Sequence, residues 1–121
     1  MNHNGRILIA DDDFNQPLME AIFALHQLDL EFARDGAEAL EKMNGDIDVA
    51  MIDVRMPRVS GIEVLQRIKA DPELQHIPVI MISASQDMER IVQCIEMGAE
   101  DYLEKPFNLV LLKARVSACL E

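Results

Sequence analysis

Short apolar segments alternate with longer amphipathic segments along this chain, and this alternation constrains the fold more than any other feature. The apolar segments are too short for typical helices, and acidic residues, Pro or Gly lie near their ends, so we expect them to be strands. We expect strands at residues 6–10, 30–33, 49–52, 77–82 and 102–103. Between them, apolar residues recur at helical spacing, which predicts helices at residues 15–28, 37–43, 62–70, 87–97 and 108–120.

Two of the predicted helices carry clear end signals. Asn15 can cap the first helix and Pro17 suits its first turn, while Gly98 can close the fourth helix in a left-handed conformation. In the last helix, one stripe should face the core, and it consists of Leu109, Leu112, Val116, Cys119 and Leu120.

Five strands that strictly alternate with five helices predict a doubly wound α/β fold. Right-handed crossovers then place helices on both faces of a parallel sheet. We expect the flavodoxin-like strand order 2-1-3-4-5, which opens a crevice beside strands 1 and 3 at the carboxyl ends of the strands. The length of 121 residues suits one domain spanning residues 1–121, with a core at about 6–120 and no effector domain.

The charge and apolar content of the chain exclude several classes of function. Acidic residues number 22 against 11 basic ones, so the net charge is −11 and a nucleic-acid surface on this domain is not expected. There is no apolar run of membrane-spanning length and no signal peptide, so we expect no membrane contact and a cytoplasmic location. Cys94 and Cys119 match no metal or redox motif and are expected to be reduced.

Chemically useful side chains follow the predicted strands at one edge of the sheet. Asp11 and Asp12 follow the first strand, Asp53 the third, Ser83 the fourth and Lys105 the fifth. Three carboxylates this close raise one another's pKa unless a cation neutralises them. Magnesium, with manganese as the alternative, suits such a set of oxygen ligands.

These residues occur in four ordered motifs. They are Ile9-Ala10-Asp11-Asp12, Asp53-Val54-Arg55-Met56-Pro57 followed by Gly61, Ser83-Ala84, and Tyr102 ahead of Lys105-Pro106-Phe107. Together they resemble the receiver domains of two-component response regulators, of the chemotaxis-regulator type, over residues 6–120. The resemblance implies a phosphorelay protein that is not an enzyme in its own right and that takes its phosphoryl group from a histidine kinase or phosphotransfer protein.

The resemblance also assigns the magnesium ligands and the phosphoacceptor. Asp53 is the carboxylate that forms an aspartyl phosphate. Asp12, Asp53 and the backbone carbonyl of Arg55 bind the ion directly, and Asp11 binds it through water.

The resemblance implies that four other residues bind the phosphoryl group or respond to it. Lys105 pairs with Asp53 and with the phosphoryl oxygens, and Ser83 and the amide of Ala84 donate hydrogen bonds to them. Tyr102 swings inward when Ser83 is drawn toward the phosphoryl group, which changes the surface of the fourth helix, fifth strand and fifth helix.

Two side chains near this site are expected to set the lifetime of the phosphoryl group, and two on the last helix are expected to take part in binding a partner. Arg55 and Ser85 flank the phosphoryl group and should tune how long it survives. Val110 and Leu111 lie off the core stripe of the last helix, so this surface could bind a second copy of the chain or a downstream partner.

Two other functions fit parts of the sequence. A receiver-like interaction module that is never phosphorylated would share the fold, although all five site residues are present. A haloacid-dehalogenase-type phosphatase would use Asp11, Asp13, Ser83 and Lys105, but it also needs an acidic pair after the lysine, and only Glu121 follows Lys105.

Overall fold

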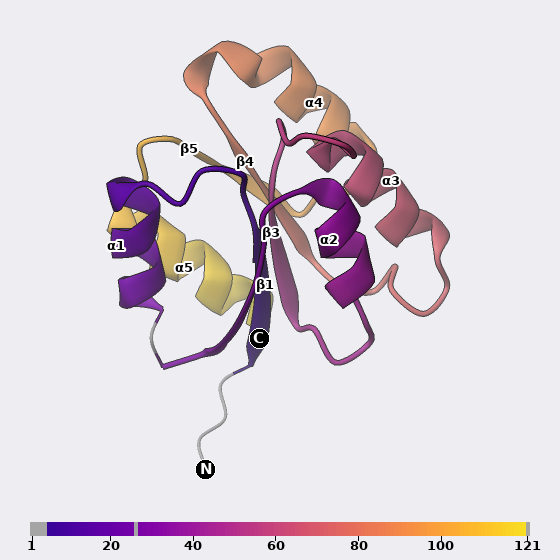
Figure 1. The fold of residues 1–121 in the computed structure, drawn as a ribbon, viewed down its shortest axis with the longest axis horizontal. Helices are drawn as coiled ribbons and strands as arrows, with labels where there is room; N and C mark the ends of the chain where they lie inside the picture. Colours follow the sequence, from indigo (N-terminus) through magenta and orange to yellow (C-terminus); the bar gives the residue numbers. More distant parts are fainter. Residues whose placement is uncertain (1–4, 26, 121) are drawn as a thin grey trace.

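The structure is a computed structural model that describes residues 5–25 and 27–120, apart from the side chains of Gln16 and Ser85. Strands and helices alternate throughout (Figure 1). The strands are β1 (Arg6–Ala10), β2 (Asp29–Ala33), β3 (Val49–Asp53), β4 (Val79–Ser83) and β5 (Asp101–Glu104). The helices are α1 (Gln16–Ala24), α2 (Gly36–Lys42), α3 (Gly61–Ala70), the 3₁₀ turn η1 (Ser85–Asp87), α4 (Met88–Glu96) and α5 (Leu109–Leu120).

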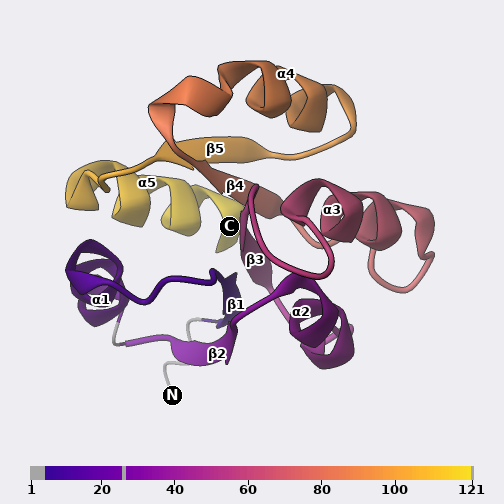
Figure 2. The same ribbon diagram turned by 45° about the horizontal axis from the view of Figure 1, so that its top comes forward.

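The five strands form one parallel sheet in the order β2-β1-β3-β4-β5, which confirms the predicted fold. Helices α1 and α5 cover one face, and α2, α3 and α4 lie on the other (Figures 1 and 2). The strand order changes direction between β1 and β3, because β2 lies on one side of β1 and all later strands lie on the other. Ligand sites in doubly wound folds form beyond the carboxyl ends of the strands at such a point.

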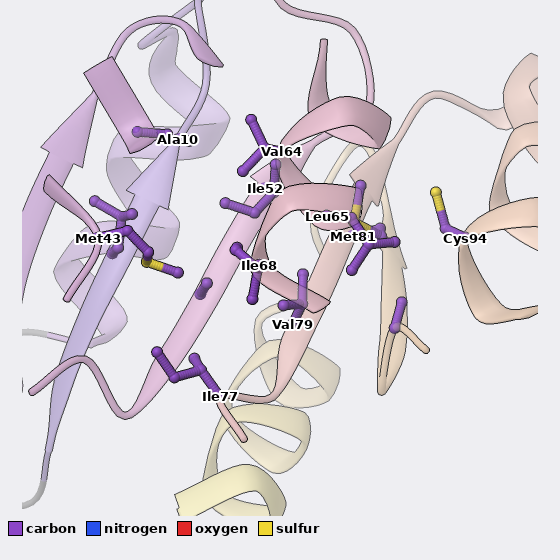
Figure 3. Packing of buried hydrophobic residues seen from close by; sticks show 14 of the residues in the cluster. Ala10, Met43, Ile52, Val64, Leu65, Ile68, Ile77, Val79, Met81 and Cys94 are labelled. Carbon is purple, nitrogen blue, oxygen red and sulfur yellow. The ribbon is translucent and has the colours of Figure 1, made fainter. Parts of the chain in front are cut away.

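Alternate residues of the central strands build two separate cores. Leu8 and Ala50 face the layer of α2, α3 and α4, whereas Ile7 and Val49 face α1 and α5. Figure 3 shows part of the first core, where residues of α3 such as Leu65 and Ile68 pack on β3 and β4. Because both faces of β1, β3 and β4 are buried, these strands read as continuous apolar runs.

The first helix is shorter than predicted. Asn15 caps it as expected, its side chain accepting a hydrogen bond from the Leu18 amide, but α1 ends at Ala24 rather than at residue 28. The Leu25 amide donates to the carbonyls of Ile22 and Phe23, which closes the last turn. Leu28 still packs against the core from the following turn, so its spacing mimicked a further helical turn.

The predicted core stripe of the last helix is wrong at its first position. Leu112 and Val116 are buried and Cys119 and Leu120 are partly buried, but Leu109 is 38% exposed. Leu109 is the first residue of α5 and lines a groove against α1 instead of the sheet. Asn108 precedes α5 as its cap, accepting hydrogen bonds from the two amides that follow Leu109.

The other predicted elements are confirmed with small shifts at their ends. The fourth strand is β4 at Val79–Ser83 rather than 77–82, and the 3₁₀ turn η1 precedes α4. Gly98 follows α4 with a φ of 113°, the left-handed conformation that the sequence predicts for it. None of the described helices has the length and apolar character needed to span a membrane.

Candidate functional site

Four strand ends bring the predicted site residues together at one edge of the sheet. Asp11 follows β1, Asp53 is the last residue of β3, Ser83 is the last residue of β4 and Lys105 follows β5. The Lys105 amide donates a 2.8 Å hydrogen bond to the Ser83 carbonyl, which fixes the end of β5 against the end of β4. The site is therefore held by the sheet itself.

Three carboxylates form a compact acidic group. Asp11, Asp12 and Asp53 each offer an oxygen, and these oxygens all lie within 4.8 Å of one another. Asp11 and Asp53 are buried, with 0% and 5% exposure, whereas Asp12 is exposed. Oxygen ligands with this mixture of burial and access fit a hard divalent cation that keeps some of its water.

Lys105 is the cation that the chain itself supplies to this group. Its Nζ atom donates a 2.9 Å hydrogen bond to Asp53 Oδ2 and forms an ion pair with Asp11 Oδ2 at 3.0 Å. The second contact does not have the geometry of a hydrogen bond, and Asp11 Oδ2 has no hydrogen-bond partner among the described residues. Burial alone would lower the pKa of Lys105, but the two carboxylates outweigh it and the pKa is raised.

Asp53 is the acid with the most perturbed environment. Burial raises its pKa to about 6, and the charge of Asp11 adds to this rise, while Lys105 and the Arg55 amide oppose it. The Arg55 amide donates a 3.1 Å hydrogen bond to Asp53 Oδ1. Without a further cation, Asp53 therefore takes up a proton at a higher pH than an ordinary aspartate does.

The backbone packs tightly behind Asp53. A Cβ atom on Gly61 would lie 1.9 Å from the Asp53 carbonyl oxygen, and the Gly61 amide donates to the Val54 carbonyl at 3.0 Å. Only glycine allows the start of α3 to approach the end of β3 this closely. Gly61 thus fixes the position of the segment that carries Asp53.

Ser83 presents an unused hydroxyl at the same edge. The residue is 1% exposed, and its Oγ atom has no hydrogen-bond partner in the part of the chain that the structure describes. Buried hydroxyls are almost always paired, so this one is available to a group that enters the site. Ala84 follows and is half-buried at the start of η1.

Arg55 makes its principal contact with a residue that the sequence did not single out. Its Nε and Nη2 atoms donate hydrogen bonds of 2.8–3.1 Å to the carboxylate oxygens of Asp87 in η1. Asp87 is 3% exposed, and the Arg55 hydrogen bonds hold its pKa below the usual range. The two residues are 32 positions apart, so no local pattern indicates the pair.

Tyr102 lies on β5, half-buried against the core that includes α4. The Arg115 guanidinium of α5 lies 5.4 Å from the centre of the Tyr102 ring, and it also donates to the Tyr102 carbonyl. This cation–π contact ties the ring to α5. Tyr102 therefore lies on the edge strand of the sheet, in contact with α5.

The remaining predicted residues lie at the periphery. Val110 is 77% exposed and Leu111 is 44% exposed, as their place off the core stripe predicts. The side chain of Ser85 lies outside what the structure describes, so its expected effect on phosphoryl lifetime stays a prediction.

Known proteins resemble the chain over nearly its whole length. Residues 7–117 match the response regulator receiver domain family. The chain is 38% identical to the chemotaxis protein CheY-3 of Vibrio cholerae, with 100% of this chain and 95% of the relative covered. It is also 38% identical to the transcriptional regulatory protein CpxR homolog of Haemophilus influenzae. That match covers 96% of this chain but only 50% of the relative, so the chain spans about half of the relative's length.

Solved structures agree with this assignment. A putative response regulator from Chloroflexus aurantiacus superposes with a TM-score of 0.88 at 29% identity, covering 96% of this chain and 97% of the other. The receiver domain of NtrX from Brucella abortus gives a TM-score of 0.85 at 28% identity, covering 94% and 97%. The chain therefore belongs to the response regulator receiver domain family and is a domain of two-component phosphorelay signalling.

Proposed function

We propose that Asp53 accepts a phosphoryl group from a histidine kinase or phosphotransfer protein and that this residue alone is modified. The buried carboxylate at the end of β3, with Lys105 Nζ at 2.9 Å and two further acids around it, is the observation that carries the proposal. Asp11 also forms an ion pair with Lys105, and Asp12 is the exposed member of the group. Asp53 accepts hydrogen bonds from the Arg55 amide at 3.1 Å and from Lys105 Nζ at 2.9 Å, which orient its oxygens for attack.

We propose magnesium as the ion of this site, with manganese able to replace it. Asp12, Asp53 and the backbone carbonyl of Arg55 would bind it directly, and Asp11 through water. The fit rests on the three carboxylate oxygens within 4.8 Å and on the raised pKa of Asp53, which a cation would lower. When bound, the ion neutralises charge on the carboxylates and on the phosphoryl oxygens.

The proposed transfer uses the side chains as they stand. An oxygen of Asp53 attacks the phosphorus of a phosphohistidine, the P–N bond breaks, and the leaving imidazole takes up a proton. Lys105 stabilises the negative charge on the phosphoryl oxygens, and Ser83 donates its unpaired hydroxyl to one of them. The amide of Ala84 supplies a second donor. Water later attacks the same phosphorus, which releases phosphate and restores the carboxylate.

The proposed output is a change in the surface formed by α4, β5 and α5. Movement of Ser83 toward the phosphoryl group frees space for Tyr102, whose ring packs against the first core and contacts Arg115 of α5. Val110 and Leu111 give α5 an exposed apolar edge for a second copy or a downstream partner. The domain would act as a switch rather than as an enzyme on other substrates, and its expected compartment is the cytoplasm.

Magnesium and acetyl phosphate test this proposal against both alternatives. The domain should gain the mass of one phosphoryl group, and Asp53→Asn should gain none. A haloacid-dehalogenase-type phosphatase would instead turn over the phosphodonor and lose activity in Asp11→Asn. A module that is never phosphorylated would do neither.

The Asp13 carboxylate is not among the clustered acids, which are Asp11, Asp12 and Asp53, and it accepts a hydrogen bond from the Asn15 side chain at 3.1 Å. This arrangement gives no support to the phosphatase role, in which Asp13 would be the second catalytic acid.

A further inference from the structure

The Arg55–Asp87 ion pair joins the loop after the phosphoacceptor to the start of α4. Three hydrogen bonds of 2.8–3.1 Å connect the guanidinium to both oxygens of the carboxylate. The second cation near Asp87, Arg90, reaches only to 4.0 Å. Asp87 is 3% exposed and Arg55 is 59% exposed, so a buried anion is neutralised by a cation that solvent can reach. The exposed partner is the one that can leave.

Asp87 occupies the N-cap position of α4 but does not cap the helix. Its side chain makes no capping hydrogen bond, and its backbone lies at φ −102° and ψ 24° rather than in the extended region. Aspartate is among the best N-cap residues because its carboxylate can accept bonds from the free amides of the first turn. In α4 the second and third residues are Glu89 and Arg90. While its hydrogen bonds go to Arg55, the Asp87 carboxylate makes no capping hydrogen bond to either of these amides.

Arg55 also has a second partner within the proposed function. Its amide is bonded to Asp53, so its side chain starts beside the phosphoacceptor. A phosphoryl group on Asp53 would bring close to two negative charges and three acceptor oxygens to that point. A planar guanidinium binds such an anion through paired hydrogen bonds.

We propose that phosphorylation exchanges the partners of this pair: Arg55 moves from Asp87 to the phosphoryl group, and Asp87 turns to cap the first turn of α4. Each charged group keeps a partner in both states, so the buried carboxylate is never left alone. Asp87 is then a positioning residue that holds Arg55 away from the phosphoryl site until phosphorylation. The exchange couples Asp53 directly to α4, in addition to any movement of Ser83 and Tyr102. It rests on the proposed function of Asp53.

The matched variants Asp87→Asn and Asp87→Ala separate the two roles of Asp87. Asparagine caps a helix as well as aspartate does but cannot form the charged pair, whereas alanine does neither. Affinity for beryllium trifluoride, a phosphoryl analogue, is measured with magnesium by titration in NMR spectra. Asp87→Asn should bind the analogue about fivefold more tightly than the wild type, because Arg55 no longer has to leave a charged partner. In an Arg55→Met background the same substitution should change nothing.

Amide hydrogen exchange in α4 gives a readout that a purely structural role of Asp87 would not move. In the wild type, exchange at Glu89 and Arg90 should slow when the analogue binds. In Asp87→Asn it should be slow without the analogue, and in Asp87→Ala fast with or without it. The Nε–H resonance of Arg55 should shift on analogue binding in the wild type.

Several outcomes would overturn the proposal. One is equal affinity of Asp87→Asn and the wild type for the analogue. Another is a rate of amide exchange at Glu89 and Arg90 that does not change when the analogue binds to the wild type. The third is an effect of Asp87→Asn on analogue affinity that persists in the Arg55→Met background. These results would leave the phosphoacceptor role of Asp53 intact. A wild type that binds no analogue and gains no phosphoryl group from acetyl phosphate would instead remove the proposed function and this exchange with it.

Discussion

Ionised Asp53 should destabilise the metal-free domain, and Asp53→Asn should relieve this. The pKa of Asp53 rises from 3.8 to about 6 on folding, mainly because the carboxyl is buried. The folded protein therefore holds this proton more tightly than the unfolded chain. Below about pH 4, Asp53 does not change the free energy of unfolding. As the pH rises through about 6, ionisation of Asp53 lowers this free energy by up to about 3 kcal/mol. Asparagine carries no charge at any of these pH values and avoids this loss.

Urea unfolding at a series of pH values in the presence of a chelator measures the effect. Asp53→Asn should exceed the wild type in free energy of unfolding by up to about 3 kcal/mol at pH 8, and the difference should shrink toward zero by about pH 4. Asp46→Asn is the matched control, because Asp46 is exposed and its loss changes net charge equally. This control should stay within about 0.5 kcal/mol of the wild type. A difference that is absent at pH 8, or as large at pH 4, would refute the reasoning.

Three further substitutions test the site and the fold around it. Gly61→Ala places a Cβ 1.9 Å from the Asp53 carbonyl oxygen and should cost at least about 3 kcal/mol of unfolding free energy. The control Gly45→Ala, whose Cβ would have its nearest neighbour at 4.0 Å, should cost nothing, and equal urea midpoints for the two variants would contradict this. Lys105→Met should slow phosphoryl uptake from acetyl phosphate about 100-fold by mass spectrometry, and an unchanged rate would remove Lys105 from the mechanism. Leu112→Ala should cost about 2–5 kcal/mol in urea unfolding, because this side chain of α5 is fully buried; a change below 1 kcal/mol would count against the described packing.

The order of elements and the edge that carries the site could be predicted because both depend on local patterns. An apolar run such as residues 49–52 followed by Asp53 indicates a buried strand and also places its last side chain at the carboxyl edge. Parallel pairing then brings Asp53 near Asp11 without further information. Burial on both faces of the sheet leaves continuous apolar runs in the sequence, and the observed strands follow these runs closely.

Features that depend on distant contacts could not be read in this way. Helical spacing continued through Leu28, but the chain turns at Leu25 and Leu28 packs from the turn. Leu109 fits the core stripe of its helix, yet the first turn of α5 faces a groove against α1. Asp87 looked like an ordinary helix start, and only the folded chain brings Arg55 to it.

The central claim is that Asp53 is the phosphoacceptor of a site shared with Lys105, Ser83 and a magnesium ion. A crystal structure of the domain with magnesium and beryllium trifluoride tests this most directly. The account predicts beryllium on an oxygen of Asp53, with Ser83 Oγ and Lys105 Nζ within hydrogen-bonding distance of its fluorines. Beryllium on Asp11, or an analogue bound to Asp53 with neither Ser83 nor Lys105 in contact, would contradict it.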